Sequence, residues 1–231
     1  MAIPHTPFPL GRTAEFDERS KNFAFGARPS RTDPLPTAPN QVIHRVYGKR
    51  LNQRDVGACT GFAGIGARNT APNHHVGEVS LPDSTGFAVY HRATELDDIP
   101  GTWQPDGWGE DTGSSGLAAC KAMVEMGIFT KYEWCFGLQH LLLALPSNPV
   151  MAGTNWYEGM FSPTGKGLVQ ISGSIAGGHE WVVRGYSLKY QLFYCLNSWG
   201  NKWGIGGEFL MSFPTMDRLL REDGDLKVPI V

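Results

Sequence analysis

The chain has 231 residues, of which 41% are hydrophobic, which excludes a wholly disordered protein and predicts one large domain or two small ones. Its 29 glycines and 16 prolines predict a fold rich in loops and tight turns. The net charge of -2 gives no broad basic face, so we expect neither nucleic acid nor a membrane surface among its partners.

The first 40 residues are predicted to form an extended arm. Its stretch 34–39 carries three prolines, each of which fixes its own backbone and restricts the residue before it. We favour a surface wrap, held by Phe23 and Phe25, over an inhibitory or docking segment.

The N-terminus lacks the basic segment and apolar run of a secretory signal, and no stretch is apolar enough to span a bilayer, so the expected location is cytoplasmic.

Residues 41–148 are predicted to form a helical half. The first helix is so rich in glycine that it must be buried and held by packing. Serine caps the third helix, which ends at a glycine. The predicted helices cover Cys59–Arg68, Thr85–Leu96, a segment that follows Ser114 or Ser115 and ends at Gly127, and Gln139–Leu145.

Residues 149–231 are predicted to form a β-rich half. Alternating apolar and polar residues with many aromatics indicate an antiparallel sheet or barrel. The fold class is therefore α+β, with a domain over 41–231 whose two halves hold a cleft between them. The predicted elements are strands Leu168–Ile171, His179–Leu188, Tyr190–Leu196 and Gly207–Phe213, and a helix over Met216–Glu222.

Cys59 begins the first predicted helix. A thiol at a helix N-terminus has a lowered pKa, because the free N–H groups and the macrodipole favour the thiolate, which is the nucleophilic form. Taken alone, a single cysteine is more often a small buried hydrophobic residue. Cys120, Cys135 and Cys195 are expected to be core thiols of that kind, free of disulfides.

A histidine and an asparagine stand at the ends of two predicted strands. His179 enters an apolar strand, and a strand end holds a side chain rigidly. Asn197 ends a later strand, where its amide oxygen can accept the ring N–H of a histidine, and Trp199 can cover that bond and keep water from it. Each alone has an ordinary alternative, a structural histidine or a turn asparagine.

Together these segments resemble the papain-like cysteine peptidases, a family that uses a Cys-His-Asn set. Residues 56–60, Val-Gly-Ala-Cys-Thr, match the central three positions of the family's cysteine signature. Gln53 stands where the family keeps its oxyanion glutamine, and residues 197–204, Asn-Ser-Trp-Gly-Asn-Lys-Trp-Gly, resemble its most specific stretch. The resemblance covers roughly residues 42–215 and implies the papain-like α+β fold.

The chain departs from the family near the cysteine. Val56 replaces a disulfide cysteine, in keeping with a reducing compartment, and Thr60 and Gly61 replace a Trp-Ala pair that shapes the cleft. Too few residues precede Cys59 for a full pro-domain. Compact members without a pro-domain occur in bacteria and actinobacterial phages, and residues 178–181, Gly-His-Glu-Trp, and the stretch 212–220 resemble that branch.

The resemblance implies a cysteine endopeptidase that hydrolyses peptide bonds through a thioester on Cys59. It implies a thiolate–imidazolium pair of Cys59 and His179, in which the imidazole serves as acid and base. Asn197 would hold the ring in position, and Gln53 would join the Cys59 N–H in binding the oxyanion.

Gly113, Gly178 and Trp199 are candidates for substrate binding. Gly113 offers backbone hydrogen bonds to an extended peptide, and Gly178 leaves room for a side chain beside the histidine, although plain turn glycines are the equal alternative. We expect no cofactor and no metal, since the acidic cluster 222–225 lacks the spacing of a calcium loop.

Two other functions stay open at this level. One is a catalytically silent structural or binding protein on the same fold, for example a phage virion component with assembly partners in the virion. The other is a hydrolase of peptidoglycan peptides. The complete set of Gln53, Cys59, His179 and Asn197 favours an active peptidase acting on a peptide or protein substrate.

Overall fold

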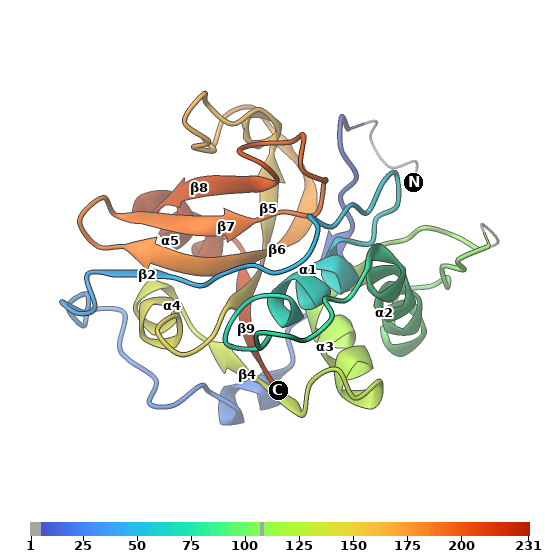
Figure 1. Cartoon of the computed structure of the whole chain (residues 1–231), viewed down its shortest axis with the longest axis horizontal. Coiled ribbons are helices and arrows are strands. Elements are labelled where there is room, and N and C mark those ends of the chain that lie inside the picture. The colour runs from blue at the N-terminus through green and yellow to red at the C-terminus, as the bar shows by residue number, and fades with distance from the viewer. Residues whose placement is uncertain (1–5, 107–108) are drawn as a thin grey trace.

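Two halves lie side by side, one made of helices and one built on a sheet, as Figure 1 shows. This computed structural model describes residues 6–106 and 109–231. The first three α-helices pack against one another, and the last two flank the sheet. The helices are α1 (Cys59–Arg68), α2 (Asp83–Leu96), α3 (Gly116–Glu125), α4 (Leu138–Ala144) and α5 (Phe213–Arg221), with short 3-10 turns η1 (Glu18–Asn22) and η2 (Glu158–Phe161).

An antiparallel sheet of seven strands forms the second half. Its order is β4-β9-β5-β6-β7-β8, and β2 also pairs with β6. A separate two-stranded parallel sheet joins the arm to the helical half. The strands are β1 (Arg12–Thr13), β2 (Gln41–Ile43), β3 (Ser114–Ser115), β4 (Lys131–Cys135), β5 (Val150–Tyr157), β6 (Ile175–Ser187), β7 (Leu192–Leu196), β8 (Glu208–Ser212) and β9 (Asp225–Ile230).

The central strands of the sheet separate two hydrophobic cores. Along β6, Trp181 and Val183 pack into the core of the sheet half, whereas Val182 packs among the helices. Met151 of β5 and Leu196 of β7 also face the helices. Because side chains alternate along a strand, neighbouring residues of β6 serve opposite halves of the molecule.

Helix α1 is buried along nearly its whole length, and its glycines make this possible. A Cβ at Gly61 would lie 2.4 Å from the carbonyl oxygen of Gly86 in α2 and 2.8 Å from the backbone nitrogen of Tyr90. A Cβ at Gly66 would lie 3.2 Å from Cγ2 of Val182 in β6. The helix therefore approaches both α2 and the sheet more closely than an alanine-rich helix would allow.

The helical predictions are confirmed, and α1 has the predicted bounds. The strand predicted over Leu168–Ile171 is wrong, because Leu168 makes only an isolated bridge with Leu210. Gly167 and Gly173 have positive φ and turn the chain on either side of it. The sequence pattern also does not predict β4, β5 and β9, which form the other side of the sheet.

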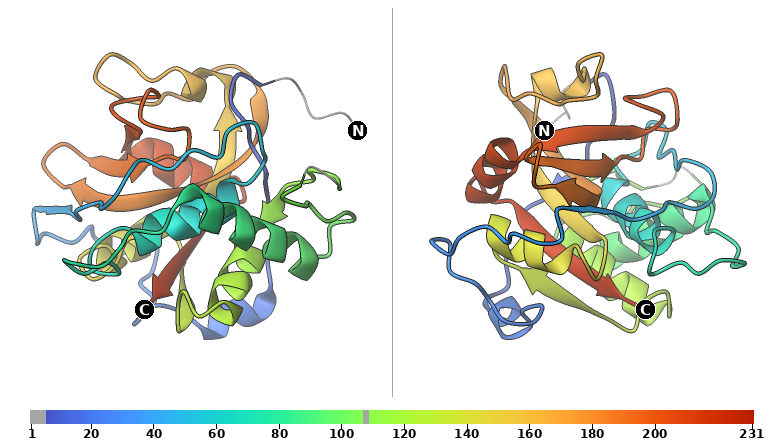
Figure 2. Two further views of the ribbon diagram at one scale, coloured as in Figure 1. Left: turned by 45° about the vertical axis from the view of Figure 1, so that its right-hand side comes forward. Right: turned by 60° about the vertical axis from the view of Figure 1, so that its left-hand side comes forward.

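The described part of the arm lies over both halves. Its strand β1 runs parallel to β3, its residue Ala24 bridges Trp134 of β4, and it ends at β2. In the left view of Figure 2 the dark-blue N-terminal segment runs down between the two halves. Leu10 and Arg12 are buried, so this stretch is more than a surface wrap.

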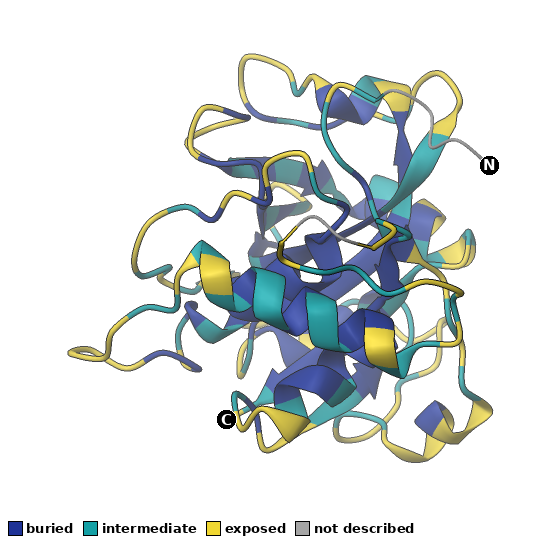
Figure 3. Ribbon diagram, turned by 90° about the vertical axis from the view of Figure 1, so that its right-hand side faces the viewer, coloured by how far each residue is buried: buried dark blue, intermediate teal, exposed yellow. Residues whose placement is uncertain are grey.

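Buried residues gather at the centre and exposed residues at the loops, as Figure 3 shows. The four cysteines all lie within the described residues and are buried and free, which confirms the expectation that they form no disulfides. Among the described residues, no helix combines the length and apolarity needed to cross a membrane.

We predict that Gly61→Ala destabilises the protein by about 1–3 kcal/mol, although alanine favours helix formation, because its Cβ meets backbone atoms of α2. Urea unfolding monitored by circular dichroism measures this change. Gly165→Ala is the matched control, since no atom lies within 4 Å of its added Cβ. An unchanged or higher free energy of unfolding for Gly61→Ala would contradict the packing described for α1.

Candidate active site

His179 and Asn197 are joined by a buried hydrogen bond of 2.7 Å between Nε2 and Oδ1. The backbone N–H of Ser198 donates to the same Oδ1 at 2.8 Å, which identifies that atom as the amide oxygen. An oxygen acceptor requires the proton on Nε2, so Nδ1 of the imidazole is the unprotonated nitrogen. Nδ1 is buried and has no hydrogen-bond partner among the described residues.

Two tryptophans enclose the imidazole. The ring of Trp199 stacks on His179 with centroids 4.5 Å apart, and Trp156 of β5 meets the ring edge-on at 4.9 Å. These rings exclude water from the His179–Asn197 bond, as expected for Trp199 from the sequence. Trp156 is a site residue that sequence reasoning missed, because nothing in a buried run such as β5 distinguishes one aromatic residue from another.

Cys59 lies at the N-terminus of α1, where no side chain caps the free N–H groups. Its thiol is fully buried, and backbone groups of Glu180 and Gly11 lie close enough to it to act on its pKa. Glu180 directly follows His179 in β6, so the sulfur lies against the strand that carries the histidine.

Gln53 is held close to the same residues. Its Nε2 donates to the carbonyl of Val56 at 2.8 Å, and its Oε1 accepts from Ser198 Oγ at 2.6 Å. Its backbone N–H donates to the carbonyl of Ser198 at 2.9 Å, next to Asn197. Hydrogen bonds thus connect Gln53, through Ser198, with Asn197 and His179, and Cys59 lies next to Glu180, the neighbour of His179 in β6.

Residues 8–13 of the arm, here called the arm segment, lie directly on this site. Phe8 stacks on Trp199 with centroids 4.9 Å apart. The carbonyl of Pro9 accepts from Trp199 Nε1 at 3.1 Å and from Gln53 Nε2 at 3.4 Å. A Cβ at Gly11 would lie 1.9 Å from the carbonyl oxygen of Gly57, two residues before Cys59, so only glycine fits there.

The two candidate glycines for substrate binding face the backbone of the arm segment. The carbonyl of Gly178 accepts from the N–H of Gly11 at 3.1 Å, and the N–H of Ser114 donates to the carbonyl of Gly11 at 2.8 Å. A Cβ at Gly113 would lie 2.3 Å from the Gly11 carbonyl oxygen, and one at Gly178 would lie 2.0 Å from that of Arg12. An extended backbone therefore fits between them, and the donor beside Gly113 is Ser114.

Burial keeps the cysteine and histidine neutral while the arm segment is in place. It raises the pKa of the Cys59 thiol to about 12, against smaller opposite effects of the backbone hydrogen bonds from Glu180 and Gly11. It lowers the pKa of His179 to about 4, although the hydrogen bond to Asn197 acts in the other direction. The lowered thiol pKa expected from the helix N-terminus is thus wrong for this arrangement, because exclusion of water outweighs the macrodipole.

No family model and no curated protein matches the sequence, whereas solved structures match the fold. Xylellain, a cysteine protease from Xylella fastidiosa, matches at a TM-score of 0.71 over 100% of this chain and 99% of its own, with 14% identity. The bromelain protease from Ananas comosus, solved in complex with the E64 inhibitor, matches at 0.60 over 84% and 100%, with 16% identity. The cysteine protease CMS1MS2 from Carica candamarcensis matches at 0.57 over 83% and 98%, with 15% identity.

The chain has the papain-like fold. At such low identity the matches show the fold alone, and they agree with the α+β arrangement expected from the sequence. Within this papain-like fold, the site lies where the helical half and the sheet half meet.

A cluster of charged side chains beside the site was also missed by sequence reasoning. Arg12 of the arm segment pairs with Asp225 at 2.6 Å, and Lys227 pairs with Glu180 at 2.8 Å. Both side chains of the second pair are fully buried. No local signal marks them, because the partners are separated by long stretches of chain and meet only in the fold.

We predict that the buried neutral state of His179 makes stability depend on pH. An unfolded histidine titrates near pH 6.5 and this one near 4, so between these values only the unfolded chain binds the proton. The contribution is present above about pH 6.5 and is lost as the pH falls toward 4. Urea unfolding of the wild type and His179→Gln measures it.

The stability advantage of the wild type over His179→Gln is expected to shrink by roughly 2–3 kcal/mol between about pH 7 and about pH 4.5. His179→Gln is the baseline for the wild type, because the two proteins share all other titrating groups. An advantage that does not change with pH would contradict the burial of this imidazole.

Proposed function

We propose that this protein is a cysteine endopeptidase and that Cys59, His179, Asn197 and Gln53 are its catalytic residues. The observation that carries the proposal is the fixed imidazole, whose Nε2–H is held by Asn197 and whose free Nδ1 belongs to the strand against which the Cys59 sulfur lies. The papain-like fold supports the same reaction class, since xylellain is described as a cysteine protease and bromelain as a protease.

The reaction begins with transfer of the Cys59 thiol proton to Nδ1 of His179. The sulfur then forms a bond to the peptide carbonyl carbon, and the carbonyl oxygen becomes an oxyanion. His179 returns the proton to the leaving amine as the C–N bond breaks, which leaves a thioester on Cys59. Water, deprotonated by the same imidazole, hydrolyses the thioester and restores the thiol.

Two donors are available for the oxyanion, Gln53 Nε2 and the backbone N–H of Cys59 at the uncapped start of α1. The Pro9 carbonyl already accepts from Gln53 Nε2. This contact supports the assignment, because it shows that a peptide carbonyl can reach the proposed donor.

In the proposed resting state the arm segment occupies the substrate site. It takes the hydrogen bonds that Gly178 and Ser114 offer and keeps the thiol neutral by excluding water. Catalysis requires the segment to withdraw, after which solvent and substrate reach Cys59 and the pKa of the thiol falls toward its ordinary value.

The decisive experiment measures cleavage of a peptide mixture by the purified chain and its variants. Cys59→Ala and His179→Ala are expected to lower cleavage to background, whereas Gln53→Ala lowers kcat by roughly 10²–10³-fold and leaves residual activity. His75→Ala is the control, since this histidine is exposed and remote from the site. Wild-type cleavage by Cys59→Ala would remove the catalytic assignment.

A second measurement tests the resting state. Gly11→Ala is expected to speed labelling of Cys59 by a peptidyl epoxide several-fold, because the added Cβ collides with the backbone at Gly57 and displaces the arm segment. Thr37→Ala, an exposed change elsewhere in the arm, is the control. Equal labelling rates in Gly11→Ala and the wild type would show that the arm segment does not limit access.

A catalytically silent structural protein on this fold would give neither cleavage nor selective labelling of Cys59 over the other three thiols. The compact bacterial or phage type, the cytoplasmic or virion location and peptidoglycan peptides as substrate stay predictions from the sequence.

A further inference from the structure

The guanidinium of Arg12 is inserted into a closed pocket beside the candidate active site. Its side chain is only 2% exposed. Nη2 donates to Asp225 Oδ2 at 2.6 Å and to the carbonyl of Asp223 at 2.7 Å. Arg19 of the same arm, by contrast, pairs with Asp17 while its side chain is 81% exposed. The arm therefore buries one arginine selectively.

Asp225 and Glu180 place two carboxyl groups around Arg12, and the ammonium of Lys227 contacts both. Burial raises the pKa of Glu180 to about 7, so these groups carry a net negative charge without Arg12 only when Glu180 is ionised. Burial opposes ionisation of Asp225, but Lys227 and Arg12 outweigh it and lower its pKa, so this side chain is a carboxylate at neutral pH. An unpaired buried charge is strongly unfavourable, and Arg12 gives Asp225 a cation of its own while Lys227 is shared with Glu180.

Glycines give the pocket its room. A Cβ at Gly153 would lie 2.3 Å from Glu180 Oε2, 2.7 Å from Arg12 Nε and 2.7 Å from Asp225 Oδ1. A Cβ at Gly116 would lie 1.9 Å from Lys227 Nζ. Any larger residue at either position would push into the charged groups.

Two buried atoms around Gly153, Glu180 Oε2 and Arg12 Nε, have no hydrogen-bond partner within the part of the chain that the structure describes. One is an acceptor and the other a donor, and both face the position that a Cβ of Gly153 would take. Glu180 Oε2 is therefore an unused acceptor inside the pocket, available to a cationic donor that sits differently from Arg12. The pocket therefore suits a cationic side chain in general and not only Arg12.

The main-chain hydrogen bonds beside the pocket do not select one side chain over another. Gly11 is bound through its N–H and carbonyl by Gly178 and Ser114, and main-chain hydrogen bonds of this kind accept any extended peptide. Any selection among side chains beside these hydrogen bonds must therefore be made by the pocket that holds Arg12.

We propose that the Arg12 pocket is a substrate-specificity pocket that takes an arginine, or less well a lysine, from the peptide once the arm segment has withdrawn. The arm segment is then an internal mimic of a basic substrate. This inference rests on the proposed peptidase function, and the experiments below separate the failure of one from the failure of the other.

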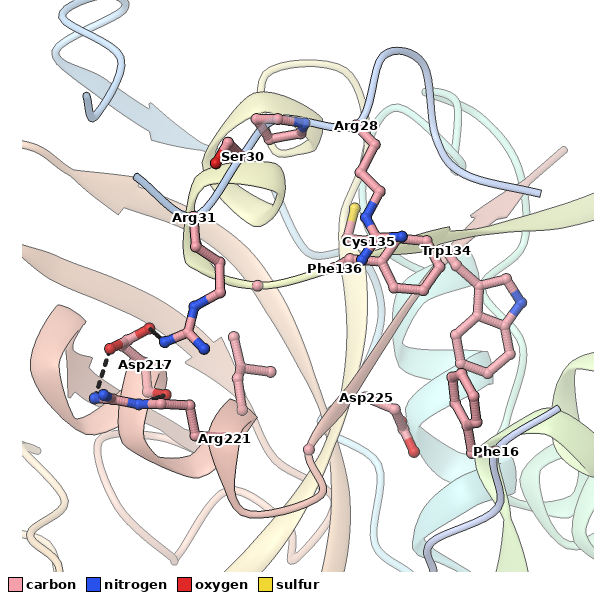
Figure 4. Close-up of a pocket in the computed structure, with 14 residues that line it drawn as sticks. Phe16, Arg28, Ser30, Arg31, Trp134, Cys135, Phe136, Asp217, Arg221 and Asp225 are labelled. Atoms are coloured by element: carbon pink, nitrogen blue, oxygen red, sulfur yellow. Dashed lines mark hydrogen bonds and ion pairs between the residues drawn. The ribbon is translucent and has the colours of Figure 1, made fainter. Parts of the chain in front are cut away.

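Asp225 of the pocket also borders a cavity of about 640 Å³ that lies between the arm and the sheet half. Figure 4 shows Asp225 at the wall of this cavity, near Trp134 and Phe16, with Asp217 and its two arginine partners across from it. Asp225 is 13% exposed, so a small cation can be tested there without moving the whole arm.

The first experiment measures cation binding without activity. Arg12→Ala is expected to have a lower Tm, and n-propylguanidinium to restore several degrees of it, because the cation refills the pocket. Neutral n-propylurea is the matched ligand, and Arg19→Ala is the matched variant, expected to show no gain. Equal effects of the two ligands on Arg12→Ala would overturn the proposal.

The second experiment measures the cleavage of a peptide set by the full chain. Arg, Lys, Leu or Glu is placed in turn at each of the three positions on either side of the cleaved bond. One position is expected to prefer Arg by roughly ten- to hundred-fold over Leu, the range for a charge-assisted hydrogen bond. Asp225→Asn should abolish this preference, whereas Asp217→Asn, which lines the same cavity, should preserve it.

Cleavage of the set without a basic preference at any position would overturn the pocket assignment and leave the peptidase intact. Absence of cleavage of every peptide, by the wild type and by Arg12→Ala alike, would overturn the peptidase function and this inference with it. If Arg12→Ala does not fold, the preference measured on the wild type decides the question alone.

Discussion

The contact between α1 and the middle of β6 is the interaction on which the rest of the structure depends. It joins the two cores, because Val182 packs among the helices while Val183 packs inside the sheet half. The same alternation sends His179 toward Trp156 and Asn197 and sends Glu180 toward Lys227 and α3. A shift of one residue in the register of β6 would exchange these two side chains and destroy both the imidazole site and the charged pocket.

Several titratable groups are buried at this junction, and burial affects them in different ways. His179 is neutral and oriented by an amide oxygen, so its burial needs no counter-charge. Glu180 is different: burial raises its pKa to about 7, and Lys227 acts against this as a nearby cation. A Cβ at Gly153 would lie 2.3 Å from Glu180 Oε2 and 2.7 Å from Arg12 Nε, so glycine is needed there for these groups to keep their positions.

Sequence reasoning succeeds where the signal is local. Cys59 after a Gly-Ala turn, and Asn197 before a Trp-Gly turn, are each readable from a few neighbours, and alternation predicts β6 to β8. It fails for β5, which is buried on both faces between the two cores and therefore shows no alternation. It fails again for β9, because Lys227 and Pro229 are residues typical of exposed or irregular segments. Lys227 is buried in the strand only because the distant Glu180 pairs with it.

In the proposed mechanism, the arm segment and a peptide substrate depend on the same main-chain groups, which cannot distinguish between them. The advantage of the arm is that it is covalently attached, since a flexible tether gives a local concentration on the order of millimolar. Weak contacts then suffice to hold it, and those that select it are the stacking of Phe8 on Trp199 and the ion pair of Arg12 with Asp225. Under the proposed specificity, a peptide that supplies its own cation to Asp225 replaces the ion pair of Arg12, so the charge that holds the arm segment is also the charge that a competing substrate would carry.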